Sequence, residues 1–180
     1  NVIGGGLQLK AMPDADALGI TPEAAAEWAR ATQREFRLWA GTTECDIARQ
    51  NNFAELQQLA SLAWAMSGDV FTLLVVKPRP GVPYDLRLQL IEADRICNPN
   101  QAGVLSQQEM LLHTGNRVVQ GVEIDPDGEV VAYHVANRHP LSTNFLQGTR
   151  TWTRVEVRGR LRGEPVLLRN PGAIRPWQHV

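Results

Sequence analysis

The pattern of hydrophobic and polar positions divides the chain into a helical first part and a strand-rich remainder. A first helix is predicted from Thr21 to about Ala40. Thr21 can cap its N-terminus, Pro22 suits its first turn, and Gly41 can end it. Its apolar side chains recur at helical spacing, so we expect them in the core. This stripe consists of Trp28, Thr32, Phe36 and Trp39.

A second helix is predicted after Asn52, which forms a capping-box-like pair with Glu55 three residues on. Gly68 can end this helix, because glycine readily adopts the left-handed conformation found there. Its apolar positions are expected to pack in the core and not to form a cofactor site. They are Leu56, Leu59, Ala60, Ala63 and Trp64.

The chain opens with a glycine-rich stretch, NVIGGGLQLK. Residues 3–10 are predicted to bend and then form a short strand with Leu7 and Leu9 on one face. The run 4–6 fits neither GxxxxGK[ST] nor GxGxxG, and no helix start follows it directly. These glycines therefore indicate a bend or a close chain approach, and not a phosphate-binding loop.

Strand patterns begin at Val70. Residues 70–77 (VFTLLVVK) form a continuous apolar run that is typical of a strand covered on both faces. Residues 78–85 (PRPGVPYD) predict a turn, and residues 86–90 alternate as a half-buried strand that returns to form a hairpin. Residues 98–115 have weak periodicity and two turn clusters, so we expect an exposed excursion.

Further strands are predicted at about 117–124 and 129–136, with shorter ones at 151–157 and 164–169. Helices followed by a run of strands favour an α+β class. The expected fold is a single domain over residues 1–180, with two N-terminal helices packed on a mostly antiparallel sheet built of hairpins.

The segment GVEIDPDGEVVAYHV raises the question of a metal site at Asp125 and Asp127. An EF-hand loop that starts at Asp125 would need Gly and Glu where the sequence has Val130 and Ala136. As a type I turn, however, Asp-Pro-Asp-Gly is well specified, because its glycine at 128 tolerates a left-handed conformation. A β-hairpin is predicted here.

Composition indicates an ordinary soluble globular protein: 180 residues, 43% hydrophobic and 21% charged. The net charge of −1 hides an asymmetry. Residues 1–149 hold 11 Lys and Arg against 17 Asp and Glu, a net −6, whereas residues 150–180 hold 7 Arg against 2 Glu, a net +5. The densest arginines are Arg150, Arg154, Arg158, Arg160 and Arg162. We expect them to pair with acidic neighbours in this chain or the next subunit. No nucleic-acid-binding motif and no interleaved aromatic residues accompany these arginines, so direct contact with nucleic acid is less favoured.

No catalytic or cofactor motif emerges from the reactive side chains. Cys45 and Cys97 lack CxxC spacing and are expected to be buried free thiols, in keeping with a reducing compartment. His134 and His139 do not form a metal-binding pair, and there is no HExxH or GxSxG. No cofactor is predicted, and nothing supports an enzyme. No apolar run approaches the roughly 20 residues of a membrane span, and no signal peptide is evident.

Four blocks along the chain resemble the lambda-type portal proteins of tailed phages. They are NVIGGGLQLK, the stretch from FRLWAGTTECDIARQ to GDVFTLLV, LRLQLIEADRICNP, and GVEIDPDGEVVAYHV. The blocks occur in the family's order over roughly residues 1–139, and LIEADR and GVEID…AYH are the most specific. The arginine-rich tail is similar only loosely, as a strand before a segment that would lead onward.

The resemblance implies a structural subunit of the portal, a ring of typically twelve copies at one vertex of the phage head. Double-stranded DNA passes through such a ring, terminase docks on it, and head-completion or tail proteins attach afterwards. The resemblance implies no catalytic residues and no membrane. It further implies a virion protein assembled in the host cytoplasm. Because the chain starts at Asn1 without a methionine, we expect a fragment of something longer. The resemblance implies that it is the N-terminal, wing part of a portal whose stem lies beyond residues 150–180.

A second interpretation comes from another class, a small α+β domain that binds or hydrolyses a small ligand. It predicts a concave pocket with converging polar groups and perturbed ionisable residues.

Overall fold

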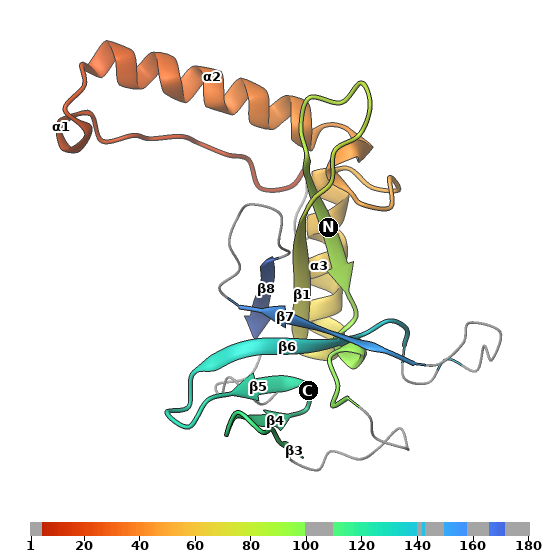
Figure 1. Ribbon diagram of the computed structural model, residues 1–180. Helices are drawn as coiled ribbons and strands as arrows, with labels where there is room; N and C mark the ends of the chain where they lie inside the picture. Colours follow the sequence, from red (N-terminus) through yellow and green to blue (C-terminus); the bar gives the residue numbers. More distant parts are fainter. Residues whose placement is uncertain (1–4, 100–109, 140–141, 143–149, 158–165, 172–180) are drawn as a thin grey trace.

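The computed structural model describes residues 5–99, 110–139, 142, 150–157 and, by their backbone, 166–171 (Figure 1). Its helical segments are α1 (Ala15–Leu18), α2 (Pro22–Ala40), η1 (Thr43–Cys45), α3 (Phe53–Ser67) and η2 (Ala93–Arg95). Its strands are β1 (Asp69–Val76), β2 (Leu86–Ile91), β3 (Met110–Leu111), β4 (Arg117–Val119), β5 (Val122–Ile124), β6 (Val130–Ala136), β7 (Trp152–Glu156) and β8 (Val166–Pro171).

The strands form two antiparallel sheets where a single sheet was expected. Sheet A has the order β2-β1-β8, and sheet B has the order β3-β4-β5-β6-β7. Sheet B crosses one face of sheet A, while α3 packs against β1 on the other face (Figure 1). The α+β class and the β1–β2 hairpin are therefore confirmed.

Both long helices begin and end where the sequence predicts. The Thr21 hydroxyl accepts a hydrogen bond from the Ala24 amide at 3.2 Å and caps α2. Asn52 and Glu55 form a complete capping box at α3. These local signals work because each satisfies helix-end amides that have no partner inside the helix.

The predicted strand at residues 7–10 is not formed. These residues run alongside α2 toward α1 instead (Figure 1). The Leu7 amide donates to the Gln57 side chain at 2.7 Å, so a side chain takes the place of a neighbouring strand. Leu7 and Leu9 are both exposed.

The predicted strand at 117–124 is two strands, β4 and β5, joined by a tight turn. Gln120 and Gly121 both have positive φ angles, 51° and 80°. The apolar positions of VVQGVEI continue on both sides of this turn, so the hydrophobic pattern alone does not reveal it.

Two apolar clusters lie on opposite faces of sheet A. On one face, Phe71 packs edge-on against Tyr133 of sheet B, with ring centroids 5.5 Å apart. On the other, Leu74 and Leu88 pack against Trp39 and Leu56 of the helices. Strand β1 is buried on both faces only near its start, since its last residue, Val76, is 45% exposed.

The segment after β2 joins the two sheets. Ile96 forms a β-bridge with Val135, and the Cys97 amide donates to the His134 carbonyl at 3.3 Å. The Asn98 side chain accepts a hydrogen bond from the Gly121 amide at 2.6 Å. Asn98 is buried, so the expected exposed excursion 98–115 does not begin at its first residue, and residues 100–109 lie outside the described part.

Gly121 generates the first prediction. A Cβ at this position would lie 2.4 Å from the Cys97 backbone nitrogen, at a φ of +80°. Backbone atoms cannot move aside as a flexible side chain can, so we expect Gly121→Ala to lower the free energy of unfolding by more than about 3 kcal/mol.

Gly128→Ala is the matched control, because Gly128 also has a positive φ of +91° but no atom lies within 4 Å of the added carbon. It should cost only about 1 kcal/mol for the left-handed backbone. Chemical denaturation measures both variants, and equal losses would contradict the role assigned to the close approach.

Candidate functional site

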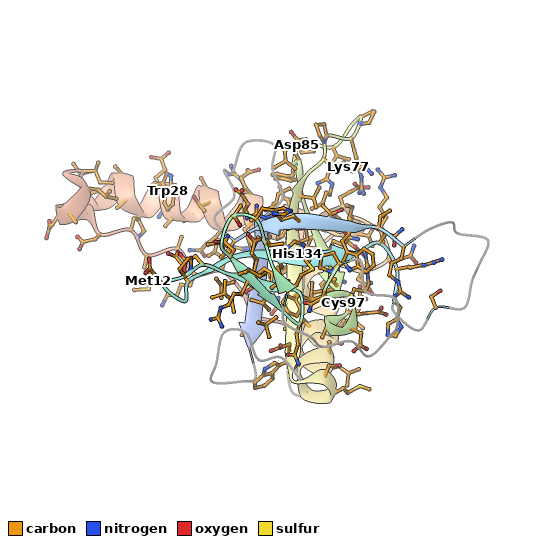
Figure 2. All side chains as sticks on the ribbon, turned by 60° about the horizontal axis from the view of Figure 1, so that its bottom comes forward. Met12, Trp28, Lys77, Asp85, Cys97 and His134 are labelled. Carbon is orange, nitrogen blue, oxygen red and sulfur yellow. The ribbon has the colours of Figure 1, made fainter. Side chains whose placement is uncertain are left out.

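Helix α2 projects from the body of the molecule and packs on it mainly through its C-terminal half (Figure 1). Trp39 near its end is 8% exposed, and its indole N–H donates to the Leu86 carbonyl at 2.9 Å. Trp28, three turns earlier in the same stripe, is 56% exposed and lies on the projecting part of the helix (Figure 2). The prediction that the whole stripe lies in the core is therefore wrong for Trp28.

An open apolar groove of about 980 Å³ lies between α2, α3 and the helix-facing side of sheet A; we call it the α2 groove. Phe36, Trp39 and Phe53 form its aromatic base, with ring centroids 5.4–5.5 Å apart. Its other lining residues include Trp28, Leu56, Ala60, Leu74, Leu86, Leu88 and Leu90. Leu59 and Trp64, also predicted to be buried, are 44% and 45% exposed on α3.

The α2 groove holds one polar pair at its edge. The Tyr84 hydroxyl donates to the Glu35 carboxylate at 2.6 Å, which lowers the pKa of Glu35 and raises the pKa of Tyr84. Among the described residues that line this groove there is no His, Cys, Lys or Arg. The surface is suited to apolar contact and offers no nucleophile–base pair for hydrolysis.

A buried polar cluster lies on sheet B, away from the groove. Glu123 on β5 is 1% exposed, and Arg154 on β7 binds its carboxylate with two hydrogen bonds, of 2.7 and 3.1 Å. The side-chain amide of Asn116 donates to the same carboxylate at 2.8 Å. His134 on β6 lies 3.1 Å from it, near the centre of Figure 2.

These contacts set the charges in the cluster. Burial opposes ionisation of Glu123, but Arg154 and Asn116 outweigh it and lower the pKa to about 2. Burial lowers the pKa of His134 despite its hydrogen bond to Glu123. Glu123 is therefore ionised and His134 is neutral, so the Nε2–H of His134 donates to the Glu123 carboxylate. Each group already has a partner within the sheet, which is the arrangement of a structural cluster.

A second ionic cluster lies between η1 and the tip of the β1–β2 hairpin. Glu44 contacts Arg79 at 2.8 Å, Arg49 at 2.9 Å and Arg87 at 4.0 Å, and the hydrogen bond from Arg79 is the main cause of its lowered pKa. Asp46 accepts hydrogen bonds from three backbone amides, which outweigh burial and lower its pKa.

The turn predicted at residues 125–128 is confirmed. The Gly128 amide donates to the Asp125 carbonyl at 3.1 Å, and the Asp125 carboxylate accepts from the amides of Asp127 and Glu129. Among the described residues, no group of three or more His, Cys, Asp and Glu is placed to hold a metal ion.

The side chains of the histidines and cysteines predicted to have no catalytic role make separate contacts. His139 pairs with Asp94 at 3.1 Å, whereas His134 belongs to the Glu123 cluster. Cys45 is buried, which raises its pKa to about 11, and it is a free thiol. Cys97 is also free but only half-buried, so the expectation of two buried thiols holds for Cys45 alone.

Of the five arginines singled out in the sequence, Arg154 is paired within the chain, with Glu123 and with Glu156. Arg150 is half-buried, and Arg158, Arg160 and Arg162 lie outside the described residues. Sequence reasoning missed both the Glu123–Arg154 pair, whose members are 31 residues apart, and the α2 groove. No local pattern marks either feature.

The two tryptophans of α2 provide the second prediction. Trp39→Ala removes a buried indole and its hydrogen bond, so it should destabilise the fold by about 3–5 kcal/mol. Trp28→Ala, the control from the same helix stripe, should cost about 1 kcal/mol or less because the side chain is mostly exposed. Thermal or chemical unfolding would contradict this assignment if Trp28→Ala were the more damaging change.

Glu123 provides the third prediction. Glu123→Gln leaves Arg154 without its buried partner charge and should lower stability by about 3 kcal/mol at neutral pH. The control, Glu156→Gln, removes an exposed partner of the same arginine and should cost less than about 1 kcal/mol.

The pH dependence gives a separate check on Glu123. Its pKa is lower in the folded chain than in the unfolded one, so the pair stabilises fully above about pH 4.5 and loses its effect as the pH falls toward 2. Denaturation curves should show a smaller loss over that window in Glu123→Gln than in the natural sequence. Parallel curves for the two proteins would refute this.

Two comparisons with known proteins bear on identity. The family model described as phage portal protein, lambda family, matches residues 1–169. The probable portal protein of Halomonas phage phiHAP-1 is 28% identical over 111 residues, which cover 62% of this chain and 20% of that protein. The chain thus spans about a fifth of the length of this relative. Because the family model covers nearly the whole sequence, the chain belongs to the lambda family of phage portal proteins.

Proposed function

We propose that this chain is part of a structural subunit of a phage portal, a closed ring at one vertex of the capsid through which double-stranded DNA enters and leaves. The match to the lambda portal family over residues 1–169 carries this proposal. The proposed subunit acts in the virion after assembly in the host cytoplasm, and twelve copies are the expected number.

The composition of the surface supports a role in assembly. Trp28, Leu59 and Trp64 are each more than two-fifths exposed, and Trp28 borders the open α2 groove. Exposed apolar surface of this extent is typical of proteins that bury it against partners. The ionisable clusters around Glu123 and Glu44 are paired internally, which supports a scaffold without catalysis.

Other partners follow from the proposed role. Terminase would dock on the ring during packaging, and head-completion or tail proteins would attach afterwards. This chain would contribute to the wing, on the outer side of the ring. Of the arginine-rich segment, Arg150, Arg158, Arg160 and Arg162 are proposed to face a neighbouring subunit or the DNA, without sequence-specific contacts; Arg154 would do so while holding Glu123.

A small-molecule site is the alternative, and the α2 groove is the observation that favours it. Its single polar pair, Tyr84 and Glu35, would orient a ligand with an apolar body. The groove offers little else that would select one ligand, which makes the structural role the better supported of the two.

The fourth prediction tests the proposed ring. The protein at its full natural length should form closed cyclic oligomers of uniform size, seen as rings by negative-stain electron microscopy and as one dominant mass by native mass spectrometry. Monomers or dimers at every concentration tested would overturn the proposed function. An apolar compound that binds the α2 groove tightly in a protein without rings would favour the alternative.

A further inference from the structure

Two exposed apolar surfaces with opposite charge lie at opposite ends of α2. The first, which we call the acidic arm, comprises residues 11–29, with α1 and the start of α2. The second, which we call the basic end, comprises residues 34–51 and 76–87, with the end of α2, η1 and the tip of the β1–β2 hairpin. Figure 2 shows Met12 on the arm, well apart from Lys77 and Asp85 on the hairpin.

The acidic arm is apolar and carries only negative charge. Met12, Leu18 and Ile20 are 77%, 61% and 41% exposed. Residues 11–29 contain four acidic residues and no Lys or Arg, a net charge of −4. All four are exposed, and none forms an ion pair within the described residues: Asp14, Asp16, Glu23 and Glu27.

The basic end has a surplus of positive charge. It holds six Lys and Arg against four Asp and Glu, a net charge of +2. Glu44 is the common ion-pair partner of Arg49, Arg79 and Arg87. The carboxylate of Asp46 accepts hydrogen bonds from backbone amides.

Two cations of the basic end lack a full set of acceptors. Arg87 is fully buried, yet its Nε and Nη2 make no hydrogen bond. The Lys77 side chain is exposed and forms no ion pair or hydrogen bond among the described residues. Arg87 cannot reach a partner because it is buried, but the exposed Lys77 and the surplus positive charge of this region favour an acidic partner.

The basic end also exposes apolar side chains of its own. Leu38, Val76 and Leu86 are 56%, 45% and 39% exposed. Both surfaces therefore combine apolar contact area with charge, and the sign of the charge is opposite on the two.

We propose that the acidic arm of one copy of this chain docks on the basic end of a second copy. The two surfaces differ and lie apart on one chain, so this contact is heterologous: each copy offers an arm to one neighbour and a basic end to another. Repetition of such a contact closes into a ring where the rotation between copies permits. The inference rests on the proposed ring and names the surfaces that join its subunits.

Opposite charge orients the two copies in this arrangement and disfavours alternatives. Two acidic arms repel each other, as do two basic ends, so a symmetric arm-to-arm dimer is disfavoured. Because the charges are solvent-exposed, the attraction between copies falls as salt screens it. The apolar side chains supply contact that salt does not screen.

Charge reversal in the full-length protein tests the proposal, which is the fifth prediction. Asp16→Lys/Glu27→Lys changes the net charge of the arm from −4 to 0, and Arg37→Glu/Lys77→Glu changes that of the basic end from +2 to −2. Each should raise the protein concentration needed for half-assembly at low salt by about tenfold or more, equivalent to about 1.4 kcal/mol per contact. Native mass spectrometry across a dilution series measures this concentration.

The variant with all four changes should assemble better than Arg37→Glu/Lys77→Glu, because a neutral arm then faces the acidic receiving surface and the repulsion between net charges of −4 and −2 is removed. Glu92→Lys/Asp127→Lys is the matched control: it reverses two exposed acids outside both surfaces and should assemble like the natural protein. Recovery in the fourfold variant also shows that lost assembly in the double variants is not caused by misfolding.

The outcomes separate this proposal from the proposed function. Rings that form equally well in both double variants overturn the arm-to-basic-end contact and leave the portal role intact. A folded fourfold variant that assembles no better than Arg37→Glu/Lys77→Glu overturns it as well. If the natural protein forms no ring under any condition, the proposed function fails, and this contact fails with it.

Discussion

The close approach of Gly121 to the Cys97 backbone is the constraint on which the two-sheet architecture depends. A side chain at 121 would separate η2 from the β4–β5 turn, and the Asn98 side chain could no longer accept from the Gly121 amide. The Ile96–Val135 bridge lies beside this contact. Sheet A and sheet B are joined here by backbone geometry, and the core around Phe71 and Tyr133 forms between them.

The same junction gives a physical meaning to the two most specific family blocks. LRLQLIEADRICNP contains β2, η2 and Asn98, while GVEIDPDGEVVAYHV contains Gly121, β5 and β6. They are separated in sequence and meet in the structure through Asn98 and Gly121. Arg95 adds a hydrogen bond from its Nε to the Ala136 carbonyl at 3.0 Å. The described contacts between these two blocks thus hold the shape of the junction.

Features set by neighbouring residues could be predicted from the sequence, and features set by distant ones could not. The caps at Thr21 and Asn52 and the turn after Asp125 are local, because each satisfies backbone groups a few residues away. The division into two sheets and the Glu123–Arg154 pair depend on strands that meet only in the fold. Periodicity predicted that Trp28 and Trp39 lie on the same side of the helix. It could not predict that only the part of the helix around Trp39 packs on the rest of the molecule.

Helix α3 carries the argument for assembly one step further. A helix that is apolar on all sides is normally buried, yet only one side of α3 packs on sheet A. Leu59, Leu62 and Met66 follow one another at helical spacing on its outer side and are 44%, 56% and 77% exposed. Between Glu55 and Asp69 this helix has no charged residue, so no charged side chain adapts that side to water. Helix α3 therefore has the composition of a helix whose outer side would be covered in the proposed assembly.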